Sequence, residues 1–200
     1  MDYFELIKGF LLSPVETFQK VKSADLGDAL KYYLVIVVIN AILSAIVGLV
    51  MVSAIWAMFA PILQQFGVPL SLAAGAGVVV FAILMIFVQL LMVFISAAWV
   101  HIFVYLLGGR KGYLQTLKSI SYGSTPSMLI GWIPFIGFIG AIWSFILAIL
   151  GVRELHEMTT GKAAIAVLLA GVVLAIIIIL IAAFFFIAFS EVMPMPMGTF

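Results

Sequence analysis

The sequence predicts an all-α integral membrane protein, a five-span helical bundle preceded by short amphipathic helices. Of the 200 residues, 66% are hydrophobic and only 8% are charged, whereas charged residues make up about 25% of soluble domains. Several apolar stretches exceed the roughly 18 residues that separate a membrane-spanning helix from a buried core helix. The chain also lacks cysteine, which excludes disulfides and thiol chemistry. A lipid bilayer is therefore its expected surroundings.

The first part of the chain, residues 1–30, is predicted to form cytoplasmic helices at the membrane interface. Residues 2–12 place apolar side chains at helical spacing and charged ones on the opposite side, which is typical of an interfacial amphipathic helix. The next four residues, Ser13-Pro14-Val15-Glu16, form a capping box that begins a second short helix. Residues 31–190 are then expected to form one transmembrane domain, and residues 191–200 a flexible tail.

The transmembrane domain is predicted to contain five spans. They lie at about residues 32–56, 78–106, 119–133, 135–152 and 163–189. Pro61 is expected to close the first of these segments, which carries a stripe of small residues at Ala41, Ala45 and Gly48. Such stripes let helices approach closely in lipid.

The third and fourth spans are short, and Pro126 and Pro134 interrupt them to give a Pro-broken hairpin with its turn at residues 131–134. Either each helix crosses a thin or locally dimpled bilayer, or the pair is a re-entrant hairpin. Residues 137–151 carry a second stripe of small residues. The fourth span is therefore expected to be the packed central helix, and the stripe of the first span is one candidate for its partner.

The placement of basic residues predicts the orientation. All nine Lys and Arg residues fall within residues 8–31, 110–118 and 153–162. Because basic residues are retained on the cytoplasmic side, we expect the N-terminus in the cytoplasm and the C-terminus on the extracellular or lumenal side. A double crossing and a re-entrant pair both return the chain to the cytoplasm, so the hairpin alternatives share this prediction.

Candidate functional residues lie around the start of the third span. They are His101, Ser121, Tyr122, Gly123 and Pro126. His101 is the only ionisable residue expected inside a span, and such a residue is a functional candidate by default; the competing interpretation is a neutral imidazole bonded to a neighbouring helix. The hydroxyls near Pro126 can satisfy the backbone groups that the proline frees, so this segment is interpreted as a helix break, made either for packing or for a ligand or ion.

The candidate residues for binding lipid or a partner are basic, and no acidic residue lies among them. They are Arg110, Lys111 and Lys118. The same charges also serve to orient a cytoplasmic loop. The expected partners are the lipid bilayer, anionic lipid headgroups, a cytoplasmic protein and a second copy of the chain. No nucleic acid is expected.

Motifs for catalysis and cofactor binding are incomplete. His156 lacks a second histidine four residues later, where Thr160 stands, so no zinc site is expected. Lys162 follows Gly161 without the upstream glycine of a phosphate loop. No serine has a plausible base and acid partner. We therefore expect no metal, no cofactor and no enzymatic activity.

Several loose motifs occur in order over nearly the whole chain. Together they resemble the Yip family (the Ypt/Rab-interacting membrane proteins), and especially the prokaryotic members of that family. The matching residues are Ser13-Pro14 with Phe18, Asp25-Leu26-Gly27, His101 with Gly108-Gly109, Ser121-Tyr122-Gly123 with Pro126, and Gly151-Val152 with His156 and Lys162-Ala163. The resemblance implies five spans and a cytoplasmic N-terminus. Eukaryotic members of the family are associated with Rab GTPases and vesicle traffic. For a chain this short we expect the plasma membrane of a prokaryote.

Two functions are compatible with these observations. The first is a non-enzymatic scaffold or adaptor that acts through its cytoplasmic face in membrane organisation or trafficking-like processes. The alternative is a small ion or proton channel or transporter with its site at the broken third span. A transport site requires Ser121, Tyr122 and His101 to face an aqueous cavity, whereas a scaffold has them buried between helices or at the cytoplasmic surface.

Overall fold

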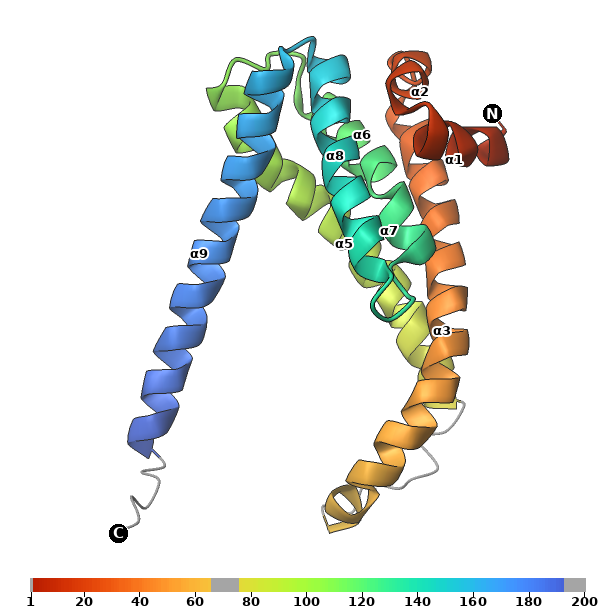
Figure 1. The fold of residues 1–200 in the computed structure, drawn as a ribbon, viewed down its shortest axis with the longest axis vertical. Coiled ribbons are helices and arrows are strands. Elements are labelled where there is room, and N and C mark those ends of the chain that lie inside the picture. The colour runs from red at the N-terminus through yellow and green to blue at the C-terminus, as the bar shows by residue number, and fades with distance from the viewer. Residues whose placement is uncertain (1, 66–75, 193–200) are drawn as a thin grey trace.

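The computed structural model describes residues 2–65 and 76–192, with side chains described for residues 2–48, 65 and 79–188, and this part of the chain contains helices and no strand. The predicted connection around residues 66–75 and the last eight residues of the predicted tail lie outside the described residues. Figure 1 shows the arrangement, in which the helices are α1 (Tyr3–Leu12), α2 (Pro14–Lys20), α3 (Leu26–Gln65), α5 (Ala76–Leu106), α6 (Tyr113–Gly123), α7 (Thr125–Ile130), α8 (Gly137–His156) and α9 (Thr160–Val192).

Four helices of the described part are long and apolar enough to cross a membrane. They contribute Leu26–Gly48 of α3, Val79–Leu106 of α5, Gly137–His156 of α8 and Thr160–Ala188 of α9. The predicted third span is divided between α6 and α7, each too short to cross alone. The class of all-helical membrane protein is therefore confirmed, with four candidate spans where five were expected.

Helix α3 is longer than predicted. It was expected to leave the membrane near residue 56 and to be closed by Pro61, but its backbone stays helical to Gln65. A proline removes one backbone hydrogen bond without removing the bonds on either side of it, so a long helix can continue past it. The proline was therefore wrong as a stop signal.

The centre of the bundle is formed by α6 together with α8, the predicted fourth span, which packs against α2, α6, α7 and α9. Seven residues of the short α6 are buried, against six of the much longer α8. A Cβ atom added at Gly123 of α6 would lie 3.1 Å from the backbone nitrogen of Ala148 in α8. The small residues of α8 thus pack on α6 and α7, whereas Gly48 of α3 has no described atom within 4 Å of such a Cβ.

The N-terminal helices belong to the same core as the bundle. Phe10 of α1 and Phe18 of α2 are fully buried, and both pack in the cluster that contains Tyr32 and Tyr122. A Cβ atom at Gly9 would lie 2.5 Å from the hydroxyl oxygen of Thr17, so only glycine lets α1 and α2 approach this closely. These helices therefore cover one end of the bundle.

The described packing of α9 on the bundle lies in its first half. Ala163, Ala166 and Val167 are buried in a second core cluster with Val104 of α5 and Val152 of α8. The indole nitrogen of Trp99 donates a hydrogen bond of 2.9 Å to the carbonyl oxygen of Ala170. Beyond this point α9 diverges from the other helices (Figure 1). Its remaining apolar surface is left to lipid.

Candidate functional site

A hydrogen-bonded chain joins the only two histidines of the protein. His101 of α5 and His156 at the end of α8 both bond to the hydroxyl of Thr116 in α6, which lies 2.7 Å from Nδ1 of His101 and 2.9 Å from Nε2 of His156. The hydroxyl has one proton, so it donates to one imidazole and accepts from the other. Three helices are thereby connected through polar atoms.

The two imidazoles differ in their surroundings. The His101 ring packs edge-on against Tyr113 at 5.8 Å between centroids, and the two histidine rings are 5.9 Å apart. His156 is buried, and its Nδ1 has no hydrogen-bond partner among the described residues. Sequence reasoning proposed His101 but missed Thr116 and His156. One feature of the sequence could have indicated this pair. Both histidines lie near the basic ends of apolar helices, and the charge pattern places those ends on one side of the membrane.

Tyr122 lies in an aromatic cluster and not in a cavity. Its ring stacks on Phe10 at 5.0 Å and contacts Tyr32 at 5.0 Å, and Phe10 also packs edge-on against Phe18 at 4.9 Å. Tyr122 is fully buried, and its hydroxyl has no hydrogen-bond partner within the described part of the chain. The cluster joins α1, α2, α3 and α6, and aromatic pairs of this kind each contribute about 0.5–1.5 kcal/mol beyond their buried area.

The break between α6 and α7 is repaired by hydroxyl groups. Pro126 has no N–H, so the carbonyl of Tyr122 lacks its normal helical donor. The Thr125 hydroxyl donates to that carbonyl at 2.6 Å, and its oxygen lies 2.8 Å from the Tyr32 hydroxyl. Because the Thr125 proton is already used, Tyr32 is the donor in the second bond. The Tyr122 carbonyl thus receives a hydrogen bond from its own segment, and the Tyr32 hydroxyl connects the break to α3.

Gly123, Pro126 and Ser121 contribute to packing around this break. The close approach of Gly123 to α8 leaves no room for a side chain, and the carbonyl oxygen of Pro126 lies 3.0 Å from where a Cβ of Gly140 would be. Ser121 is buried with no partner for its hydroxyl among the described residues. These residues and Tyr122 form one group, and His101 belongs to the separate histidine pair.

Lys118 departs from the expectation that it binds lipid or a partner. Its side chain is only 1% exposed. The ammonium donates to the carbonyl oxygens of Lys22 at 2.7 Å, Ala24 at 3.0 Å and Val21 at 3.3 Å. These carbonyls follow the C-terminus of α2, where a cation is favourable. The burial of Lys118 could not be expected from the sequence, because the sequence does not show that the segment after α2 folds over α6.

Arg110 and Lys111 remain at the surface. The guanidinium of Arg110 lies 3.7 Å from the ring centroid of Tyr105 and donates to the Tyr105 carbonyl at 2.7 Å. Lys111 forms an ion pair of 2.5 Å with Glu157, which follows α8. Both cations are therefore held in place by neighbouring groups, and about half of the Lys111 side chain is exposed.

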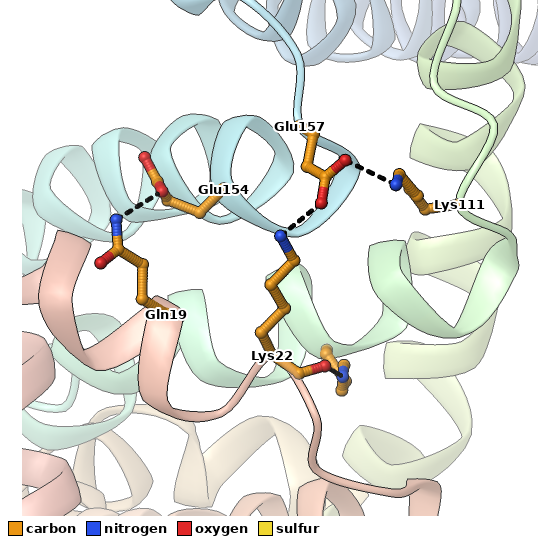
Figure 2. A network of polar contacts seen from close by, with 6 residues as sticks. Gln19, Lys22, Lys111, Glu154 and Glu157 are labelled. Atoms are coloured by element: carbon orange, nitrogen blue, oxygen red, sulfur yellow. Dashed lines mark hydrogen bonds and ion pairs between the residues drawn. The ribbon is translucent and has the colours of Figure 1, made fainter.

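Glu157 connects three segments that are distant in the sequence. Figure 2 shows its two oxygens paired with Lys22, between α2 and α3, and with Lys111, between α5 and α6, each at 2.5 Å. Hydrogen bonds from Lys111 and then Lys22 lower the pKa of Glu157 from its ordinary 4.5 to about 2. Gln19 of α2 also donates to Glu154 of α8 at 3.1 Å. This charged face, defined by Gln19, Lys22, Lys111, Glu154 and Glu157, joins the connecting segments at one end of the bundle.

The described residues contain no group of three or more His, Asp or Glu side chains that could hold a metal ion. The two histidines share a hydroxyl instead of converging on an open position. The described arrangement supports proton sharing between imidazoles, ionic contact at the charged face, and helix packing.

Comparison with known proteins agrees with the resemblance drawn from the motifs. A model of the Yip1 domain matches residues 8–194, which covers the second half of α1, all of α2, the histidine pair, the helix break and α9. Searches of curated proteins and of solved structures give no match. The match extends over more than half of the chain, and the protein therefore belongs to the Yip1 family of multi-pass membrane proteins.

Proposed function

We propose that the protein is a non-enzymatic scaffold or adaptor that acts through its cytoplasmic face in membrane organisation or trafficking-like processes. The observation that carries the proposal is the double ion pair of Glu157 with Lys22 and Lys111. It fixes the connecting segments relative to one another at the end of the molecule where the basic residues gather. A pre-organised surface of this kind lowers the entropic cost of binding a partner.

The orientation and span count are part of this proposal. We count the four long helices and the α6–α7 pair as five membrane segments, a proposal supported by the elements that carry all nine Lys and Arg residues meeting at one end (Figure 1). Retention of basic residues in the cytoplasm gives a cytoplasmic N-terminus and an extracellular or lumenal C-terminus. The plasma membrane of a prokaryote is the proposed location.

Two features of this face are suited to binding. A groove of about 510 Å³ lies between α1 and α2, and charged residues of both signs line it, namely Asp2, Glu5, Lys8, Glu16 and Lys20. Mixed charges of this kind suit a polar segment of a cytoplasmic protein more than an anionic membrane surface. Arg110 and Lys111, on the loop beside α6, are the residues proposed to contact anionic lipid headgroups.

Burial of the residues at the helix break counts against a transport site there. Ser121 and Tyr122 are fully buried, and the Tyr122 ring is enclosed by Phe10 and Tyr32. Ion binding at a broken helix requires polar backbone that lines a water-filled cavity, whereas here the Thr125 hydroxyl satisfies the freed carbonyl. The break is therefore proposed to serve packing.

The second candidate function, a small proton channel or transporter, is favoured by one observation. The chain from His101 through Thr116 to His156 is a continuous path of hydrogen bonds between α5 and α8. Imidazoles transfer protons readily near neutral pH. This candidate predicts proton movement that depends on His101.

Site-specific photo-crosslinking in cells tests the adaptor proposal. A benzophenone amino acid placed at Lys20, in the groove, is expected to form discrete protein adducts, and the same group at the exposed Leu168 of α9 is expected to react with lipid. Glu157→Gln, which removes one charge from the charged face, should reduce the yield at Lys20. Equal adducts at both positions, or adducts at neither, would contradict an adaptor that acts through this face.

A further inference from the structure

The loop between α7 and α8, residues 131–136, presents large apolar side chains at the tip of the hairpin. Phe135 is 99% exposed and has a φ of 66°, and Phe138 and Ile139 in the first turn of α8 are 72% and 61% exposed. No charged residue occurs between residues 119 and 152. A contiguous apolar tip of this size is unfavourable in water and marks contact with a membrane or a partner.

The hairpin reaches less far across the bilayer than α9 does. From Ser119 to Ile130 the descending limb spans about 18 Å, and the 20 residues of α8 span about 30 Å, part of it in the charged last turn. The apolar stretch of α9, Thr160–Ala188, has 29 residues and spans about 43 Å. Since α8 and α9 are joined by a short connection at the charged end, α9 extends about 13 Å farther.

The extra length of α9 must lie in hydrocarbon. Four consecutive residues, Ile178, Ile179, Leu180 and Ile181, are between 52% and 65% exposed. Consecutive residues of a helix point to all sides of its axis, so an apolar environment surrounds α9 at this level. Figure 1 shows α9 and α3 both continuing well past the α7–α8 loop. The bilayer therefore extends beyond the hairpin tip.

We propose that the α7–α8 hairpin is re-entrant and that its tip is inserted among the acyl chains of the leaflet opposite the charged face. Phe135 and Phe138 contact lipid there. One leaflet is then crossed by all five helical segments, whereas only α3, α5 and α9 cross the other leaflet completely, so the protein occupies more area in the leaflet of the charged face. This inference depends on helix lengths and exposure and not on the proposed adaptor function.

A single nitroxide label tests the proposal, because the chain has no cysteine of its own. Phe135→Cys is labelled in detergent and reconstituted into vesicles, and its accessibility to oxygen and to a water-soluble nickel chelate is measured. Leu180→Cys is the lipid-facing control and Gly161→Cys the aqueous one, since Gly161 is exposed and lies next to Lys162 at the charged end of α9. Phe138→Cys provides a second position on regular helix.

The Phe135→Cys label is expected to resemble the Leu180→Cys label, with high oxygen accessibility and a nickel accessibility several-fold below that of Gly161→Cys. Nickel accessibility equal to that of Gly161→Cys would show a loop in water and overturn the proposal. Spin–spin broadening that disappears on dilution with unlabelled protein would show a second copy at the tip and overturn it as well.

Discussion

Lys118 is predicted to hold α2 against the bundle, and Lys118→Met tests this role. The methionine keeps the length and apolar stem of the side chain but leaves the carbonyls of Val21, Lys22 and Ala24 without their donor. Hydrogen bonds to a charged group contribute about 1.5–3 kcal/mol each, and the cost of burying the ammonium offsets part of this sum. We therefore expect the closed position of α2 to lose about 2–4 kcal/mol.

The assay is the rate at which a buried thiol in α2 reacts with a maleimide. Thr17→Cys places the thiol at a position that is 3% exposed, so reaction requires α2 to open. Since 1.4 kcal/mol corresponds to a factor of ten, the rate should rise about 30- to 700-fold on addition of Lys118→Met. Lys20→Met, at an exposed position on α2, is the matched control. A rate within threefold of this control would refute the role assigned to Lys118.

Three further predictions concern stability in detergent. The stability difference between the wild type and Glu157→Gln should be constant from neutral pH to about 5 and vanish as the pH falls through about 2. The reason is that the lowered pKa of Glu157 gives stabilisation that is present above its ordinary 4.5 and lost on protonation. A difference that persists at pH 2 would contradict the ion pairs. Thr125→Val should cost about 1–3 kcal/mol in thermal unfolding, because the Tyr122 carbonyl and Tyr32 hydroxyl lose their partner; an unchanged midpoint would show that water replaces the threonine. Gly123→Val should lower the free energy of unfolding by about 1–3 kcal/mol, because the added side chain forces α6 away from α8. Gly161→Ala is the neutral control, and equal thermal midpoints for the two variants would contradict the close packing.

The parts of the fold that follow from local pattern could be predicted from the sequence. Apolar length identifies the long helices, and the missing N–H of Pro126 together with the hydroxyls before it indicates the break between α6 and α7. The extent of α3 could not be predicted in this way, because a single proline is compatible with both a stop and a continuing helix.

The parts that depend on tertiary contact could not be predicted. Helix α6 contains Thr116, Lys118 and Ser119, all buried, and a polar sequence of this kind is normally a sign of exposure. Burial arises because the segment between α2 and α3 folds over Lys118 and supplies the carbonyls of Val21, Lys22 and Ala24. Likewise, nothing in the sequence pairs His101 with His156, which are brought together only by the packing of α5 and α8 around α6.

Proton and ion flux in proteoliposomes is the measurement that tests the scaffold account most directly. Vesicles containing wild type, His101→Ala or Tyr122→Phe are compared with empty vesicles under a pH gradient and under cation and anion gradients. The account predicts flux equal to that of empty vesicles in every case, because Tyr122 is enclosed in packing and the histidine pair ties helices together. Wild-type flux that His101→Ala abolishes would contradict the account and assign proton transfer to the chain from His101 to His156.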